Sequence, residues 1–205
     1  TLGPGAVDSW RADHATTTGE IAERTLADGS RVVLDGDSAV SFAVTPTRRE
    51  VALLRGRAWF QVTPDPARPF VVRAGGGGVT ALGTAFSVAH VGGGVEVLVS
   101  EHAVSVALDA AGAAPLRLTE GQRARYADGR FENVGVGDTA AGLAWRVGKL
   151  AFEDRPLAWV VEEIGRHRRD RIVILDSTLA ARRISGVVDL RQPVRALAAA
   201  VGALP

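Results

Sequence analysis

The side chains of this chain that could do chemistry are few and scattered. His90 and His102 lie near Glu96 and Glu101 in the sequence, and imidazole and carboxylate groups together can hold a metal ion. A metal-binding jelly roll needs several converging ligands, commonly a His-x-His pair with a carboxylate and a further histidine. That spacing does not occur here. We therefore expect surface histidines, with no bound metal or other cofactor.

Two further patterns contain residue types used in catalysis or phosphate binding. Ser100, Glu101 and His102 supply the types of a hydrolytic triad, but adjacent strand residues point to opposite faces and cannot converge on one serine. The glycines at 75–78 are followed by neither a helix start nor a lysine, so we expect a flexible hairpin loop instead of a phosphate site. The chain also has no cysteine, which excludes thiolate chemistry. The sequence does not predict an enzyme.

One basic cluster, Arg166-His167-Arg168-Arg169-Asp170-Arg171, follows a predicted helix. A nucleic-acid surface would need a broader basic face and stacking aromatic side chains, and the formal net charge of the chain is only +1. Cations at the C-terminal end of a helix also interact favourably with its dipole. The cluster is interpreted as a solvated helix end or as a contact with an acidic partner, and not as a nucleic-acid site.

Trp159 is a second candidate for an interface. It lies two positions after Leu157, about 200° round the predicted helix and opposite its apolar stripe. A tryptophan in that position is either an exposed anchor for a partner or a side chain that docks against the preceding β-domain. The short linker before the helix favours docking.

The residues up to about 134 form a series of predicted strands and turns. Asp-Gly pairs separate apolar runs at 28–29, 35–36 and 128–129, and glycine there accepts the positive φ of a tight turn. The predicted strands cover residues 21–26, 32–34, 39–44, 51–54, 58–62, 70–74, 79–82, 84–89, 95–99, 104–108 and 122–126. Strands at this spacing indicate an all-β sandwich or roll. We assign it to residues 19–134, after an N-terminal arm at 1–18.

The pattern changes after a Gly-rich break, which we interpret as a linker over residues 135–147. Leu150 and Phe152 alternate as in a strand, and Asp154 with Pro156 predicts the cap and first turn of a helix. Its apolar stripe is Leu157, Val160, Val161 and Ile164. Strands over 172–175 and 184–190 and a helix from Pro193 complete a β-α-β-β-α order. Residues 148–205 are thus expected to form a small α/β module.

Composition supports a folded chain without a membrane span. Of the 205 residues 46% are hydrophobic, enough for a core, while 23% are charged. No apolar run approaches the roughly 18 residues needed to cross a bilayer. We interpret the chain as the soluble region of a longer protein.

The motifs of both halves resemble the FecR family of periplasmic sensor and anti-sigma regulators. They are Leu26-Ala-Asp-Gly-Ser-Arg-Val-Val-Leu34, residues 49–62, Arg68-Pro-Phe-Val-Val72, Leu82-Gly-Thr-Ala-Phe86, Glu120-Gly-Gln122, Trp145-Arg-Val-Gly-Lys-Leu-Ala-Phe152 and Ile184-Ser-Gly-Val187. The resemblance implies an all-β FecR domain followed by a module similar to the short N-terminal domain of secretins and TonB-dependent receptors.

Three positions depart from the pattern of the family. Asp35-Gly36 replaces an Asn-containing turn, Ser100-Glu101 stands where a Glu-Gly turn is common, and Arg166-His167 replaces Arg-Tyr. We expect the first change to be harmless, the second to rearrange a hairpin and the third to weaken contacts made by that aromatic. Relatives also continue beyond Leu204-Pro205 into a final strand, so we expect an unpaired sheet edge in the module.

The function implied by the resemblance is non-enzymatic signalling in the periplasm. The chain would sense the signalling domain of an outer-membrane TonB-dependent receptor, often one for iron chelates. It would belong to a single-pass inner-membrane protein whose cytoplasmic segment controls an extracytoplasmic-function sigma factor. The expected partner-binding residues are Ile172, Ile174, Ile184, Val187, Trp159, Arg166 and Arg168. The alternatives are a β-roll that binds a carbohydrate or other ligand, a jelly-roll enzyme, and a structural envelope module.

Overall fold

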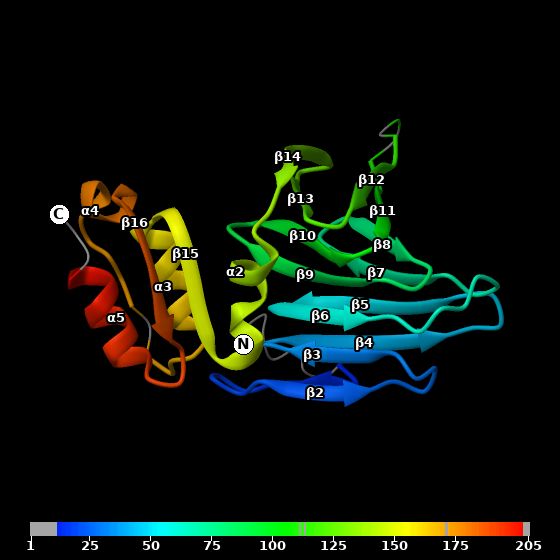
Figure 1. Ribbon diagram of the computed structural model, residues 1–205, viewed down its shortest axis with the longest axis horizontal. Coiled ribbons are helices and arrows are strands. Elements are labelled where there is room, and N and C mark those ends of the chain that lie inside the picture. The colour runs from blue at the N-terminus through cyan, green and yellow to red at the C-terminus, as the bar shows by residue number, and fades with distance from the viewer. Residues whose placement is uncertain (1–11, 111, 113, 171, 203–205) are drawn as a thin grey trace, which may run out of the picture.

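The structure is a computed structural model that describes residues 12–110, 112, 114–170 and 172–202. It consists of a large β-sandwich and a smaller α/β module beside it (Figure 1). No helix in the described ranges is long and apolar enough to cross a bilayer. The expected all-β sandwich followed by a small α/β module is confirmed.

The sandwich consists of two seven-stranded sheets. The first sheet contains, in spatial order, β1 (His14–Ala15), β4 (Ala39–Val44), β5 (Arg49–Arg55), β7 (Phe70–Ala74), β8 (Gly77–Ala81), β11 (Ala103–Leu108) and β12 (Leu116–Thr119). The second contains β14 (Arg130–Val136), β13 (Gln122–Ala127), β10 (Gly94–Glu101), β9 (Ala85–Val91), β6 (Arg57–Gln61), β3 (Arg31–Leu34) and β2 (Ala22–Thr25). Neighbouring strands are antiparallel except β5 and β7, which are parallel.

The core between the sheets forms because apolar residues alternate along the strands. In β6, Ala58 and Phe60 point inward and are fully buried. The ring of Phe60 lies 5.9 Å from that of Phe70 and 5.5 Å from that of Phe86, so all three aromatic side chains meet at the centre. Apolar side chains therefore fill the interior of the sandwich.

The four glycines at 75–78 lie in a hairpin, as expected from the sequence, but only two of them form its loop. Gly75 and Gly76 make a tight two-residue turn with φ of 50° and 77°, while Gly77 and Gly78 belong to β8. A Cβ on Gly77 would lie 3.0 Å from the ring of Tyr126, whose hydroxyl donates to the Ala74 carbonyl at 2.8 Å. The glycines therefore allow tight packing of the hairpin.

Three strands of the sandwich lie outside the ranges predicted from the sequence. They are β1, in the stretch interpreted as an arm, β12 and β14, and β14 continues to Val136, inside the stretch interpreted as a linker. The rest of that stretch forms a short helix, α2 (Thr139–Leu143), and a 3-10 turn, η1 (Ala144–Val147). Asp138 caps α2, because its carboxylate accepts from the Ala141 amide at 3.0 Å.

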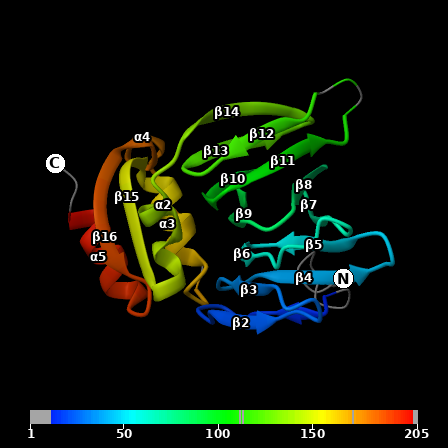
Figure 2. The same cartoon turned by 45° about the vertical axis from the view of Figure 1, so that its right-hand side comes forward.

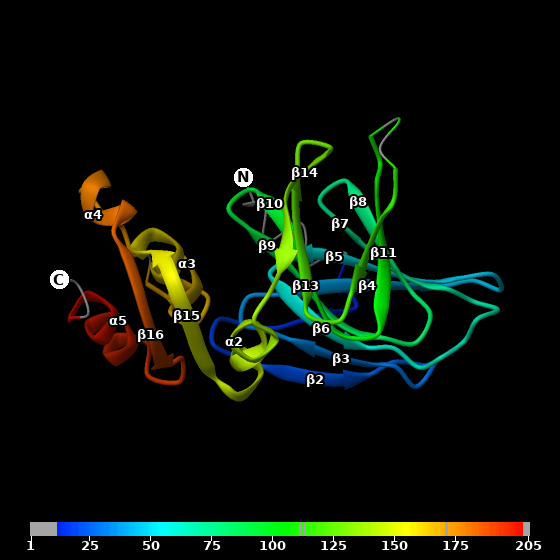
Figure 3. The same ribbon diagram turned by 45° about the horizontal axis from the view of Figure 1, so that its top comes forward.

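The module comprises β15 (Lys149–Pro156), α3 (Leu157–Gly165), α4 (Ser177–Ala181), β16 (Arg183–Asp189) and α5 (Pro193–Gly202). β15 and β16 pair as an antiparallel two-stranded ribbon. In Figure 2, α3 lies between this ribbon and the sandwich. In Figure 3, as in the other views, α5 lies on the side remote from the sandwich.

The module differs from the sequence prediction by the additional helix α4 and at two further places. Residues 172–175 are not a strand; they form an irregular segment before α4, and Val173 and Leu175 are exposed, whereas a core strand would bury alternate side chains. Asp154 does not cap α3, because it belongs to β15 and its carboxylate pairs with Arg183 at 2.7 Å. Leu204-Pro205, after which relatives continue into a final strand, lies outside the described residues.

Candidate regulatory interface between the sandwich and the module

The outer face of the second sheet carries the residues that contact the module. β6 alternates, so Arg57 and Trp59 point away from the core that Ala58 and Phe60 fill. Trp59 is only 5% exposed although it is on this outer face. Something must cover it, and α2, η1 and the module do so.

The segment after β14 brings a second tryptophan to this face. Trp145 in η1 is 1% exposed, and the Arg57 guanidinium carbon lies 4.9 Å from the centre of its ring. The guanidinium of the next residue, Arg146, lies 3.5 Å from the ring centre of Trp59. Each part thus places an arginine over a tryptophan of the other part, an arrangement favourable in a partly desolvated interface.

Apolar side chains from both parts form one continuous cluster. Val33, Trp59 and Ala85 come from the outer face of the sandwich. The buried members from η1 and the module are Trp145, Leu150, Phe152, Leu157, Val160, Val161, Ile164, Ile184, Val188, Leu190 and Ala196. The apolar stripe predicted for α3 is therefore its buried face. Because the cluster spans both parts, separating them would expose apolar area to water.

A buried ionic network crosses the same interface. The sandwich supplies Asp35, after β3, and Arg57; the module supplies Glu163 from α3 and His167 just beyond it. Arg57 reaches Asp35 at 2.5 Å and Glu163 at 2.8 Å, while His167 Nε2 lies 3.2 Å from Asp35 Oδ1. All four residues are at most 8% exposed.

Asp35 and Arg57 keep their charges despite burial. Burial alone would raise the pKa of Asp35, but the charges and hydrogen bonds of Arg57 and His167 outweigh it and hold that pKa well below its usual range. Burial acts to lower the pKa of Arg57, and Glu163 and Asp35 reverse that effect. Each charge therefore depends on a partner from the other part of the molecule.

Arg166 extends the network to the end of the neighbouring strand and to the N-terminal arm. Its guanidinium donates to the His90 carbonyl at 2.6 Å and lies 3.4 Å from Glu163. Its own carbonyl accepts from the Gly19 amide at 3.0 Å. The basic cluster after α3 is consequently not a solvated helix end at Arg166 and His167, which are docked against the sandwich.

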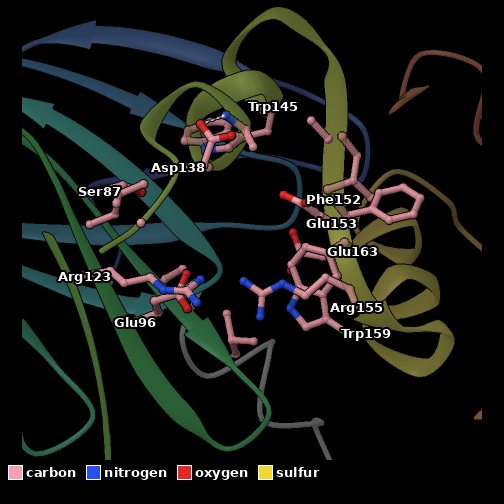
Figure 4. A pocket seen from close by; sticks show the side chains of 18 of the residues that line it. Ser87, Glu96, Arg123, Asp138, Trp145, Phe152, Glu153, Arg155, Trp159 and Glu163 are labelled. Atoms are coloured by element: carbon pink, nitrogen blue, oxygen red, sulfur yellow. Dashed lines mark hydrogen bonds between the residues drawn. The ribbon is translucent and has the colours of Figure 1, made fainter. Parts of the chain in front are cut away.

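Beside the network lies a cavity of about 350 Å³. Figure 4 shows Ser87, Glu96 and Arg123 reaching it from the sandwich, with Glu153, Arg155 and Trp159 opposite. The guanidinium carbon of Arg155 lies 4.9 Å from the ring centre of Trp159. Trp159 is half-buried and packs against the shared cluster.

The other residues predicted to bind a partner do not form one surface. Ile184 is 4% exposed and lies inside the module, while Val187 on the same strand is 67% exposed. Ile172 and Ile174 are half-buried and pack against the shared cluster. Arg168 lies 3.5 Å from Asp170. Arg171 of the basic cluster lies outside the described residues.

The residues of the ionic network were not predicted as a site. Asp35 stood out only as part of a turn, and His167 only as a departure from an expected tyrosine. Glu163 carries one local signal, because a glutamate beside the apolar stripe of a helix needs a buried partner. The arginine that pairs with Glu163 is determined by the tertiary fold and cannot be predicted from the spacing of residues in the sequence.

The histidines and the serine singled out in the sequence have structural contacts. His90 Nε2 bonds to the Leu53 carbonyl at 2.9 Å, and Ser100 donates to the Ala85 carbonyl at 3.0 Å while accepting from the Trp59 indole at 3.3 Å. His102 occupies the turn between β10 and β11 with φ of 60°. Within the described ranges no three metal-ligating side chains come together.

The β-sandwich contains the match to a known family. Residues 12–105 match the model of the family described as FecR protein. The resemblance to FecR regulators is confirmed over this stretch. The FecR family comprises regulators, a non-enzymatic kind of protein, and the chain's role is regulatory in this sense.

The two-part architecture has counterparts among solved structures. Two crystal structures of a protein from Parabacteroides distasonis ATCC 8503, described as a candidate anti-sigma factor, share it with TM-scores of 0.80 and 0.78. Each is 25% identical to this chain, and each alignment covers 91% of this chain and 88% of the other. No curated protein matches the chain.

Proposed function

We propose that the chain is the periplasmic region of an inner-membrane anti-sigma regulator. It receives a signal from the signalling domain of an outer-membrane TonB-dependent receptor and passes it, through a cytoplasmic segment, to an extracytoplasmic-function sigma factor. The FecR match and the likeness to a candidate anti-sigma factor support the regulatory part. In this proposal the division is an arm at 1–18, a FecR domain at 19–134, a linker at 135–147 and a receptor-facing module at 148–205.

One observation favours the module as the receiving surface: β16 has an outer edge without a strand partner among the described residues. The opposite edge of the ribbon, on β15, faces α2 and the interface cavity. Because residues 172–175, which were predicted as a strand, are not one, they offer no strand edge to a partner. An extended segment of the receptor can add to the β16 edge by main-chain pairing.

The outward-facing backbone groups of β16 follow from its register. The Leu190 amide donates to the Gly148 carbonyl at 2.8 Å, and antiparallel pairs alternate between bonded and non-bonded. Leu190 and Val188 therefore bond toward β15, while the amides of Val187 and Asp189 point to the free edge. The exposed Val187 is the central residue of this edge.

Proline at position 187 tests the pairing. Val187→Pro removes one outward amide without removing a bond of the ribbon, since proline is tolerated on edge strands. We expect it to weaken binding of the receptor's signalling domain at least about tenfold, the equivalent of one lost main-chain hydrogen bond. Isothermal titration calorimetry of the chain with that domain measures the change.

Val187→Ala is the matched control, because it shortens the same side chain and keeps the amide. We expect its affinity to stay within about threefold of wild type. Equal binding by the proline variant would exclude the β16 edge as the contact. No binding of the wild-type chain to the signalling domain of its cognate receptor would exclude the proposed sensing role itself.

A further inference from the structure

Asp35 contacts both the N-terminal arm and the module, the arm through its backbone carbonyl and the module through its side-chain carboxylate. Its carboxylate contacts His167, and its carbonyl accepts from the Thr16 hydroxyl at 2.5 Å. Thr16 also accepts from the Ser38 amide at 2.9 Å and is 3% exposed. The buried turn around Asp35 is thus bound on one side by the arm and on the other by the end of α3.

A second tie joins the arm directly to α3. The Gly19 amide donates to the Arg166 carbonyl, and Gly36 packs against the same carbonyl group. A Cβ on Gly36 would lie 2.5 Å from that oxygen, so only glycine allows this approach. Arm, turn and helix end therefore meet backbone to backbone.

The charges around the end of α3 favour one position of this helix against the sandwich. We call α3 seated when it is in that position. Glu163 is satisfied by Arg57 and Arg166, His167 faces Asp35, and Glu96 adds a further negative charge near Arg57. Arg166 would move with Glu163, but a small slide of α3 would separate Glu163 from Arg57 and leave both charges buried with one partner fewer, which is costly. Packed interfaces of this kind have discrete arrangements and do not deform continuously.

We propose that the C-terminal end of α3 is a latch that couples the seating of the module to the order of residues 16–19, that is, the end of the arm and the glycine that follows it. When α3 is seated, Arg166 and His167 hold Gly19 and the Asp35 turn. When α3 leaves the sandwich, the arm loses these contacts and its bonds to the turn open more often. As a route for the signal, this deepens the proposed function and rests on it; the coupling itself is a property of the chain alone.

Glu163→Ala tests the coupling from the module side, since Glu163 makes no contact with the arm. We expect hydrogen exchange at the Thr16 and Asp37 amides, which bond to Ser38 and Thr17, to accelerate about tenfold together with that of α3. Glu162→Ala removes the neighbouring exposed carboxylate and should leave both rates unchanged. Exchange is read by mass spectrometry and nuclear magnetic resonance on the whole chain without a receptor.

Thr16→Val tests the same coupling in reverse, because coupling between two sites is reciprocal. It removes the bonds to Asp35 and Ser38 and should accelerate exchange at the His167 amide by a similar factor, whereas Thr25→Val on exposed β2 should not. The latch would be overturned if exchange accelerated in α3 but not in the arm, or in the arm but not in α3. It would also be overturned if neither variant changed the exchange rates. Failure to bind a receptor would leave this result unaffected.

Discussion

At the scale of single residues, Asp35 is the carboxylate on which the interface depends most. It is fully buried and ionised, because Arg57 and His167 overcome the cost of burial. A group whose pKa is lower in the folded state stabilises the fold above its unfolded pKa, which for aspartate is about 3.9. That contribution is lost as the pH falls through this value toward the lower pKa of the folded state.

Asp35→Asn should therefore be destabilising near neutral pH and much less so in acid. We expect a loss of about 3 kcal/mol at pH 7, since the substitution leaves Arg57 buried with one carboxylate fewer. The difference from wild type should begin to shrink below about pH 4. Urea unfolding between pH 7 and pH 2 measures it; Glu162→Gln is the exposed control, and a pH-independent difference would contradict the assignment.

At the scale of elements, local patterns predicted most strands but not all. Asp-Gly turns and apolar runs located β3, β4, β7 and β13 to within a residue or so at each end. β14 was missed because its residues are largely exposed and its pattern is polar. Residues 172–175 have a strand-like composition, yet no neighbouring strand pairs with them, and composition does not reveal that lack.

The same limit applied to the interface. The apolar stripe of α3 was predictable because it repeats along a helix. The two ion pairs that cross the interface, Arg57 with Glu163 and His167 with Asp35, join residues more than a hundred positions apart in the sequence. Glycine, proline and periodicity encode local geometry, and long-range ion pairs leave no comparable trace in one sequence.

The hairpin between β10 and β11 contains an element-scale strain. His102 has φ of 60°, a left-handed conformation that suits glycine better than histidine. We expect His102→Gly to raise the free energy of unfolding by about 1 kcal/mol, measured by thermal and urea unfolding. Glu101→Gly, one residue earlier in β10, should instead destabilise, because glycine weakens a regular strand. Destabilisation by both would show that the turn has no such strain.

At the scale of the whole molecule, the shared cluster and network should make the two parts unfold together. Trp145 is central to that cooperation because its buried side chain touches both. Trp145→Ala should lower the stability by about 3–5 kcal/mol and split a single calorimetric transition into two.

Leu118→Ala is the control for that experiment. Leu118 is equally buried, but within the sandwich core alone, so its loss should lower the melting temperature while the single transition remains. Two transitions in the wild type, or one in the Trp145 variant, would contradict cooperation through the interface.

The contact between Gly19 and Arg166 also has a mechanical consequence. The arm and the module are far apart along the chain, yet they touch at this point. A pulling force applied between residues 12–15 and the module would therefore load the end of α3 through this contact. Because residues 14–15 form β1 and pair with β4, the same force would load the edge of the first sheet at the same time, while the strands further from that edge would be spared.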